Sequence, residues 1–143
     1  DEARDGFGGL TKMNVERVGY IQSDDNEHIG YSPDGVIYDG NRNIIEGVEI
    51  KCPSSSRHIK CIVEDEVPSD AQTNYMPQIV QAFIVVPTMK KMHFVSYDPR
   101  VTVKPMHIVE VERKDVEEDI AWYRSHQNEI LTEVDEIIST LAF

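Results

Sequence analysis

A Ser-Pro-Asp-Gly turn that contains Asp34, and a later Glu-x-Lys motif formed by Glu49 and Lys51, hold the side chains best suited to chemistry. Two carboxylates and an amine are groups that can bind a magnesium ion and position water for hydrolysis of a phosphodiester bond. Either motif alone is common, and a lone Glu-x-Lys usually lies on a solvated strand. Their joint occurrence predicts a magnesium-dependent nuclease site.

The elements that must position these residues form a predicted β-hairpin. Residues 29–38 and 44–52 are rich in β-branched and aromatic side chains, and they flank a cluster of turn formers. If the turn centres on residues 41–42, Asp34 lies directly opposite Glu49. A turn on the preceding Asp-Gly pair would break this register.

Side chains alternate between the two faces of a strand, so Glu49 and Lys51 share one face, and Val48, Ile50 and Cys52 share the other. We expect the apolar face to pack on a core and the charged face to line a cleft. Opposed carboxylates about 5 Å apart repel each other unless a cation lies between them. The pairing therefore predicts bound Mg²⁺, for which Mn²⁺ can substitute.

The backbone around Asp34 is predicted to be sharply bent and held in place. Pro33 fixes its own φ, and Gly35 tolerates the positive φ that other residues avoid. We therefore expect the aspartate at a fixed position at the mouth of the hairpin.

The length and composition of the chain fit one globular domain, residues 1–143, that is large enough to bury a core. No apolar run approaches the length of a membrane span. Cys52 and Cys61 lack the spacing of a zinc site and predict a reducing, intracellular setting. The histidines show no metal-binding spacing, and we interpret them as surface or hydrogen-bonded core residues.

A net charge of −12 argues against a protein that coats DNA passively, because nonspecific binding depends on lysines and arginines that neutralise phosphates. A nuclease remains possible, since it needs acidic ligands and only a local basic lining. The candidates for that lining are Arg57, Lys60, Lys90, Lys91 and Arg100. Taken singly, each is better explained as solubilising surface.

The rest of the chain predicts alternating helices and strands. Residues 1–10 have the composition of a helix end, with the glycines at positions 6, 8 and 9 as the stop signal. The other predicted elements are a strand over 15–21, a helix over 57–63, a loop over 64–74, a helix over 75–86, strands over 92–97 and 106–111, and a helix over 115–141. We interpret an apolar stripe in the last helix, which includes Ile130, Val134 and Ile137, as core packing, with an oligomer contact as the alternative.

The helix over residues 75–86 carries Gln78 and Gln81 on a face apart from its apolar stripe. Pro77 is tolerated only in the first turn, which places the start of this helix near Asn74. The two glutamines either contribute to a site or form the solvated face of an amphipathic helix.

Four motifs, in their order and approximate spacing, make the sequence similar to the phage lambda exonuclease and YqaJ-type viral recombinase family of alkaline exonucleases. They are Ser32-Pro33-Asp34-Gly35, Glu49-Ile50-Lys51-Cys52-Pro53, Tyr75-Met76-Pro77-Gln78 and Ser96-Tyr97-Asp98-Pro99-Arg100. The resemblance covers nearly the whole chain. It implies an α/β PD-(D/E)xK restriction-endonuclease-like fold, with a central mixed sheet flanked by helices, and a nuclease domain whose upstream segment is missing.

The resemblance also implies a role for each matching residue. Asp34 and Glu49 would bind the catalytic magnesium, with the backbone carbonyl of Ile50 as a further ligand. Lys51 would orient and help to deprotonate the attacking water. Gln78 would contact metal-bound water or the scissile phosphate.

Three further positions follow from the same comparison. Ser32 matches a serine near the pocket that accepts the 5′-phosphate of DNA. Glu2 lies one or two positions from the place of the family's helix-borne glutamate, which is another metal ligand. The segment from Tyr75 to Tyr97 is one residue longer than in the family, which leaves Gln81 as an alternative to Gln78.

The activity implied is 5′→3′ exonuclease digestion of one strand of linear double-stranded DNA. It releases 5′-mononucleotides and leaves a 3′ single-stranded overhang for a single-strand annealing protein. The resemblance further implies a homotrimer and, for a phage-encoded protein, the cytoplasm of the bacterial host. Two alternatives are a non-catalytic docking module for an annealing protein and a structure-specific endonuclease of the same fold.

Overall fold

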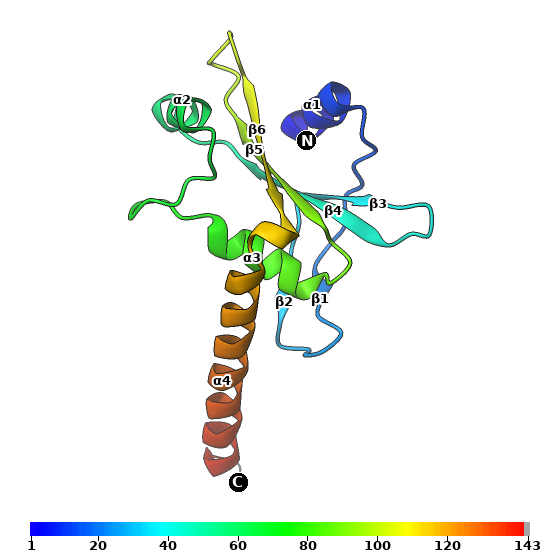
Figure 1. The fold of residues 1–143 in the computed structure, drawn as a ribbon, viewed down its shortest axis with the longest axis vertical. Helices are drawn as coiled ribbons and strands as arrows, with labels where there is room; N and C mark the ends of the chain where they lie inside the picture. Colours follow the sequence, from blue (N-terminus) through cyan, green and yellow to red (C-terminus); the bar gives the residue numbers. More distant parts are fainter. Residues whose placement is uncertain (142–143) are drawn as a thin grey trace.

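The computed structural model describes residues 1–141 and shows a mixed α/β fold built on a four-stranded sheet (Figure 1). The strands, in their order across the sheet, are β3 (Gly35–Tyr38), β4 (Ile44–Lys51), β5 (Lys91–Tyr97) and β6 (Met106–Glu112). β4 and β5 are parallel and the other two pairs are antiparallel, so the central mixed sheet is confirmed.

The hairpin of β3 and β4 has the register predicted for a turn at residues 41–42. Gly35 pairs with Val48 and Ile37 pairs with Glu46. A bulge follows Ile37, and the side chain of Asp39 accepts hydrogen bonds from backbone N–H groups inside the turn. The register places the residue just before β3 beside the end of β4.

The first predicted strand, residues 29–38, is interrupted. It forms a two-residue strand, β2 (Gly30–Tyr31), and then β3, and Pro33 lies between them without an N–H to donate to a ladder. β2 pairs with β1 (Ile21–Gln22), which is all that forms of the predicted strand over 15–21. That strand prediction was wrong: in its first part only Glu16 makes an isolated bridge, to the outer edge of β3.

The predicted end of the first helix at its glycines was also wrong. α1 (Glu2–Thr11) continues through all three glycines and ends at Lys12, which adopts a left-handed conformation. Packing explains this result, because Phe7 is fully buried against the sheet and Gly6 lies so close to Met106 that a Cβ would be 3.2 Å from its methyl carbon. Tertiary contacts therefore override the low helix propensity of glycine.

Two helices connect the parallel strands β4 and β5. They are α2 (Ser55–Glu64) and α3 (Met76–Val85), separated by a loop over residues 65–75. Both helices and the loop agree with the prediction, and Pro77 lies in the first turn of α3. The serine at the N-cap of α2, Ser54, makes no side-chain capping bond.

The two faces of the sheet are covered by different helices. Phe7 of α1 packs with Val48 and Val95 on one face. On the other face, α3 contributes Phe83 to a larger core that includes Phe94. In Figure 1, α1 and α2 lie on opposite sides of the sheet, and α3 crosses beneath it.

The last helix, α4 (Glu117–Leu141), follows a 3₁₀ turn (Arg113–Asp115) and extends away from the rest of the fold (Figure 1). Its first half packs against α3 and the large core, where Ile120 is buried and Tyr123 and Leu131 are partly buried. The interpretation of its apolar stripe as core was wrong, because Ile130, Val134, Ile137, Ile138 and Leu141 are between 41% and 63% exposed. The helix is simply longer than the body that it packs against. Among residues 1–141, no helix combines the length and apolar character needed to cross a membrane.

Candidate active site

Glu49 is the centre of a hydrogen-bonded cluster at the end of β4. Its side chain is 2% exposed and points toward α3, on the face opposite Val48. Oε1 accepts hydrogen bonds from Lys51 Nζ at 2.6 Å and from Gln78 Nε2 at 2.7 Å, and Oε2 accepts one from the Tyr31 hydroxyl at 3.4 Å. Three elements, β4, α3 and β2, therefore hold this carboxylate in one orientation.

Lys51 completes a triangle with Glu49 and Gln78. Its ammonium group donates to Gln78 Oε1 at 2.9 Å and lies 5.1 Å from the centre of the Tyr75 ring. The alternation predicted for β4 is seen here, because Glu49 and Lys51 share the face that α3 covers. The amine is held by three partners and is restricted in position.

Asp34 lies just before β3 and is fixed at both its side chain and its backbone. Oδ2 accepts a hydrogen bond from the Ile50 N–H at 2.8 Å, and the carbonyl oxygen accepts one from Arg4 Nε at 2.9 Å. The second bond comes from α1, so a helix on the opposite face of the sheet helps to position the Asp34 turn.

The reason why glycine follows Asp34 differs from the one expected. No glycine among residues 1–141 has a positive φ. A Cβ on Gly35 would instead lie 2.4 Å from a methyl carbon of Val15. Glycine is therefore required here because Val15 lies so close, and not because the backbone is left-handed.

The electrostatics of the cluster favour an added positive charge. Burial raises the pKa of Glu49, and the nearby Asp34 carboxylate raises it further, although Lys51 acts in the opposite direction. Burial also raises the pKa of Tyr31, and the charges of Glu49 and Asp34 add to this effect. Two carboxylates thus interact within a buried region, where a divalent cation would relieve their repulsion.

The groups present fit a magnesium ion that keeps several waters. Such an ion commonly takes only one or two carboxylates from the protein. The N–H and C=O of a strand residue point to the same side, so the Ile50 carbonyl faces Asp34 as its N–H does. Within residues 1–141, no cluster of three or more His, Cys, Asp or Glu side chains is arranged to hold a metal. Asp34, Glu49 and this carbonyl are the candidate ligands among the oxygen atoms at the site, which also include Gln78 Oε1.

Glu2, the other candidate ligand, does not join this cluster. Its carboxylate accepts a hydrogen bond from the Tyr97 hydroxyl at 2.5 Å. Glu2 belongs to α1, on the far face of the sheet from Glu49. Ser32 is exposed and lies two residues before Asp34, at the edge of the site.

The two glutamines of α3 have different surroundings. Gln78 contacts Glu49 and Lys51 as described above. Gln81 donates to the carbonyl of Gly30 at 3.3 Å and accepts from Gln127 of α4. The structure therefore brings Gln78, and not Gln81, into the cluster.

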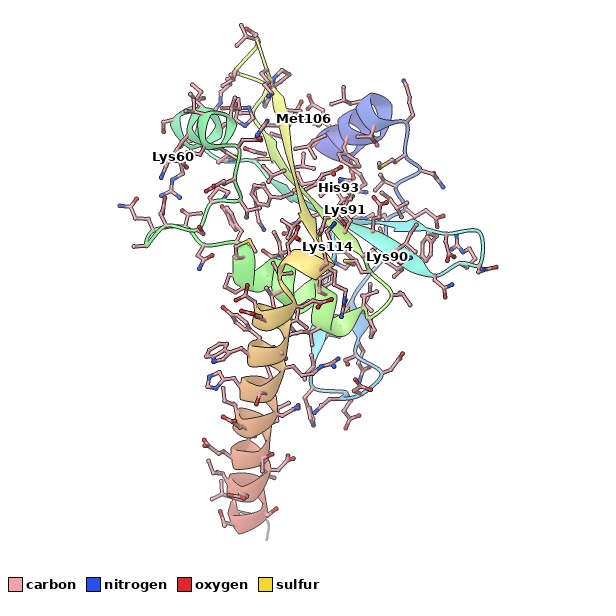
Figure 2. The ribbon with its side chains drawn as sticks, viewed as in Figure 1. Lys60, Lys90, Lys91, His93, Met106 and Lys114 are labelled. Carbon is pink, nitrogen blue, oxygen red and sulfur yellow. The ribbon has the colours of Figure 1, made fainter. Side chains whose placement is uncertain are left out.

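The five cations considered as a basic lining do not gather around the site. Lys60 lies on α2, well apart from Lys90 and Lys91 near the start of β5 (Figure 2). Lys91 pairs with Glu110 and Glu112, and Arg100 pairs with Asp98. Only Arg57 and Lys60 of this group line the cavity next to Lys51.

Sequence reasoning missed Tyr31, Arg4 and Tyr75, which support the site without belonging to a motif of charged residues. Their contacts to Glu49, Asp34 and Lys51 link distant parts of the chain. The one available signal was position, since Tyr31 directly precedes the Ser-Pro-Asp-Gly motif and Tyr75 is the first residue of the Tyr-Met-Pro-Gln motif.

The fold and the site define an α/β protein with two carboxylates, a lysine and a glutamine gathered at the end of a strand in a mixed sheet. The model of the YqaJ-like viral recombinase domain matches residues 1–90, and this chain belongs to that family. The matched range contains Asp34, Glu49, Lys51 and Gln78. No protein with curated annotation matched the sequence.

A solved structure shares the fold over nearly the whole chain. The alkaline exonuclease LHK-Exo from Laribacter hongkongensis superposes with a TM-score of 0.69 and 24% sequence identity, covering 99% of this chain and 71% of that one. The structure of LHK-Exo in complex with dAMP gives the same score and identity, with 70% of its chain covered. At this identity the match establishes the fold.

Proposed function

We propose that this protein is a magnesium-dependent deoxyribonuclease that digests one strand of linear double-stranded DNA in the 5′→3′ direction. It would release 5′-mononucleotides and leave a 3′ single-stranded overhang. The observation that carries the proposal is the hydrogen-bonded cluster of Glu49, Lys51 and Gln78 at the end of β4, together with the Asp34 carboxylate that accepts a hydrogen bond from the Ile50 N–H in the same strand. The fold would then be of the PD-(D/E)xK type, with Asp34 and the Glu49-x-Lys51 motif as its signature.

Each residue has a proposed chemical role that fits its position. Asp34 and Glu49, with the Ile50 carbonyl, would hold Mg²⁺, which would stabilise charge on the phosphoryl oxygens and activate a water molecule. Lys51 is fixed by Glu49 and Gln78 where its ammonium group can orient the attacking water and balance negative charge. The side-chain amide of Gln78 holds the Glu49 carboxylate and the Lys51 ammonium group in place.

Membership of the YqaJ-like family supports the proposed direction of digestion and the proposed partners. Ser32, exposed beside Asp34, would accept the 5′-phosphate of the DNA end. LHK-Exo was solved with dAMP, which is a mononucleotide of the kind proposed here as product. A single-strand annealing protein would use the 3′ overhang, and a homotrimer is the proposed assembly.

A digestion assay tests the proposal. Linear duplex DNA and a covalently closed circle of the same sequence are incubated with the protein and Mg²⁺, and released mononucleotides are measured. We expect release from the linear DNA only, and a loss of at least about 100-fold in Asp34→Asn and Glu49→Gln. Asp24→Asn, in an exposed loop, is the matched control and should remain active.

Two other results would redirect the assignment. Digestion of the closed circle would favour a structure-specific endonuclease, because no free end is available. A folded protein that releases no nucleotide in Mg²⁺ or Mn²⁺ would favour a non-catalytic docking module. Retention of activity in Glu49→Gln would remove the assignment of that residue.

A further inference from the structure

The outer part of α4, residues 128–141, carries an apolar stripe that lies open to solvent. The stripe continues from Leu131, which packs partly on the core, toward the end of the helix that projects from the body (Figure 1). Its other members are 41–63% exposed, and they are Ile130, Val134, Ile137, Ile138 and Leu141. Single exposed apolar side chains are common on protein surfaces, whereas a continuous stripe of them marks a site of contact with another molecule.

The spacing of the stripe is that of a helix that packs against another helix. Leu131, Val134, Ile138 and Leu141 recur at intervals of three and four residues, which is the repeat by which two helices interlock. Helices of about 12–15 residues or fewer are only marginally stable in water without tertiary packing. A second helix on the stripe would supply that packing to the outer part of α4.

Acidic side chains lie along both margins of the stripe. Residues three or four positions apart are neighbours on a helix, so Glu133 lies beside Ile130. By the same spacing, Asp135 lies beside Leu131, and it is about 200° around the helix from Glu133. Residues 128–141 contain four acidic side chains and no lysine, arginine or histidine. The stripe is therefore bordered by negative charge on each side.

This distribution of charge disfavours two possible occupants. A second copy of the helix would place its own acidic margins beside these, and like charges across an interface repel each other. DNA is disfavoured because its phosphates are negative and residues 128–141 bring no cation to neutralise them. A helix with an apolar face and with lysine or arginine along its margins complements the stripe in both shape and charge.

We propose that the outer part of α4 is a docking site for an amphipathic helix of a different protein, with basic residues along the margins of its apolar face. The partner helix lies along the stripe and covers Val134, Ile138 and Leu141, and its cations pair with Glu133 and Asp135. The stripe contributes no residue to the candidate active site. The inference is therefore independent of the proposed nuclease function and goes beyond it.

Three synthetic peptides of about three heptads each test the proposal, by fluorescence anisotropy with the protein. The first has leucine at the a and d positions and lysine at the positions that flank them. The second replaces the lysines with glutamate, and the third keeps the lysines but replaces the leucines with serine. We expect the first peptide to bind at least about tenfold more tightly than either of the others, because it alone offers both an apolar face and positive margins. Equal binding of the first and third peptides would overturn the docking site.

Two pairs of charge reversals separate contact with the stripe from general attraction to an acidic protein. Glu133→Lys with Asp135→Lys reverses both margins and should reduce the preference for the lysine peptide over the glutamate peptide to within about twofold. Glu129→Lys with Glu136→Lys makes the same change in net charge, at positions whose neighbours three and four residues away are all polar. This control should keep the preference. An equal loss in both pairs would show that binding follows only net charge, and would also overturn the site.

Val134→Gln with Ile138→Gln removes apolar contacts at two exposed positions, with a residue that favours helix formation. Helix content by circular dichroism should be kept, and the lysine peptide should bind at least about tenfold more weakly. The oligomeric state, measured by light scattering, should be that of wild type. Undiminished binding would contradict the proposal, and a lower oligomeric state in this variant would show that a second copy covers the stripe instead.

The same variants are assayed for release of nucleotides from linear duplex DNA, which keeps this proposal apart from the proposed function. Each should digest DNA as wild type does. Wild-type protein that binds the lysine peptide but releases no nucleotide would remove the nuclease function and leave the docking site in place.

Discussion

Glu49 is a buried carboxylate, and burial disfavours its ionised form. Lys51, Gln78 and Tyr31 satisfy its oxygens, yet its pKa is raised by burial and by the charge of Asp34. A residue in this condition lowers the stability of the protein that carries it, and such a feature is typical of functional sites.

We therefore predict that Glu49→Gln stabilises the metal-free protein. A raised carboxyl pKa means that the folded state binds the proton of Glu49 more tightly than the unfolded state does. The loss of folding stability caused by ionised Glu49 is therefore absent below the unfolded pKa near 4.5, and it is complete above the folded pKa. In EDTA, thermal melts should show a gain of a few degrees at pH 8 that disappears at pH 4. Mg²⁺ should then stabilise wild type and leave Glu49→Gln unchanged. A variant that melts earlier than wild type at pH 8 would contradict this view of Glu49.

Gln78 and Gln81 offer a comparison between two equivalent side chains on one helix. Gln78 positions Glu49 and Lys51, whereas Gln81 links Gly30 to α4. Gln78→Ala should reduce kcat about 10- to 100-fold, the usual effect of removing a residue that orients catalytic groups. Gln81→Ala should keep kcat within about twofold. The reverse result in a steady-state digestion assay would move the role to Gln81.

Among single site residues, those that share a strand or a motif could be predicted from the sequence. Alternation along β4 was enough to place Glu49 and Lys51 on one face. Sequence spacing could not decide between the two glutamines, since both are one turn apart on the same helix. The supporting bonds from Tyr31 and Arg4 depend on the packing of distant segments, which no local pattern records.

Among the elements, α2 is held in place by a buried polar contact to the turn that follows β5. Asp98 accepts a hydrogen bond from Ser55, at the first turn of α2, at 2.6 Å and pairs with Arg100 at 2.7 Å. His58 bonds to Ser96 at 2.7 Å from the next turn of the helix. These contacts fix α2 beside the cavity and the end of β4.

Removal of the Asp98 carboxylate should loosen α2 in a pH-dependent manner. Hydrogen bonds from Arg100 and then Ser55 hold the pKa of Asp98 well below its ordinary value of 3.8. A depressed pKa contributes stability above the unfolded pKa, and this stability is lost as the pH falls through the folded value. Asp98→Asn should therefore melt several degrees below wild type at pH 7, with a smaller difference at pH 3. Asp24→Asn, an exposed control, should have the melting temperature of wild type. A difference in melting temperature between Asp98→Asn and wild type that does not change with pH would exclude the ionic explanation.

The elements were predicted best where hydrophobic periodicity was strong. The hairpin register, α2, α3, β5 and β6 were confirmed, because each has a regular pattern bounded by turn formers. The end of α1 was predicted wrongly because buried Phe7 outweighs the neighbouring glycines. The strand predicted over residues 15–21 forms only at Ile21–Gln22, because Gly19 divides a weak pattern. Local propensity decides the structure only where packing does not oppose it.

Across the whole molecule, negative charge dominates and many cations are paired within the chain. The net charge is −12, and Arg42, Lys60, Lys91 and Arg100 each form an ion pair with a carboxylate. The proposed DNA binding would then depend on the candidate active site and few phosphate contacts.

We predict a weak dependence of DNA binding on salt. A protein that makes 6–10 phosphate contacts loses roughly 10³- to 10⁵-fold in affinity between 50 and 200 mM salt. About two contacts would reduce affinity only about tenfold over the same range. Fluorescence anisotropy with linear duplex DNA and Ca²⁺ measures this slope. A loss of 10³-fold would show that an extensive basic surface had been overlooked.

The environment of the second half of α4 could not be predicted from its hydrophobic periodicity. Its apolar stripe has the spacing of a buried helix face, and the same spacing serves core packing or contact with another chain. Which one occurs depends on whether the body of the protein extends along the helix, and here it does not (Figure 1). Family membership, in contrast, followed from four short motifs and was confirmed by the match over residues 1–90.

The proposed reaction depends on one divalent cation shared by Asp34 and Glu49. Crystals soaked in Mn²⁺ and measured for anomalous scattering test this claim most directly. We predict one anomalous peak within about 2.0–2.4 Å of an oxygen of each carboxylate. Ordered Mn²⁺ elsewhere, with Asp34 and Glu49 free of metal, would contradict the proposed reaction centre.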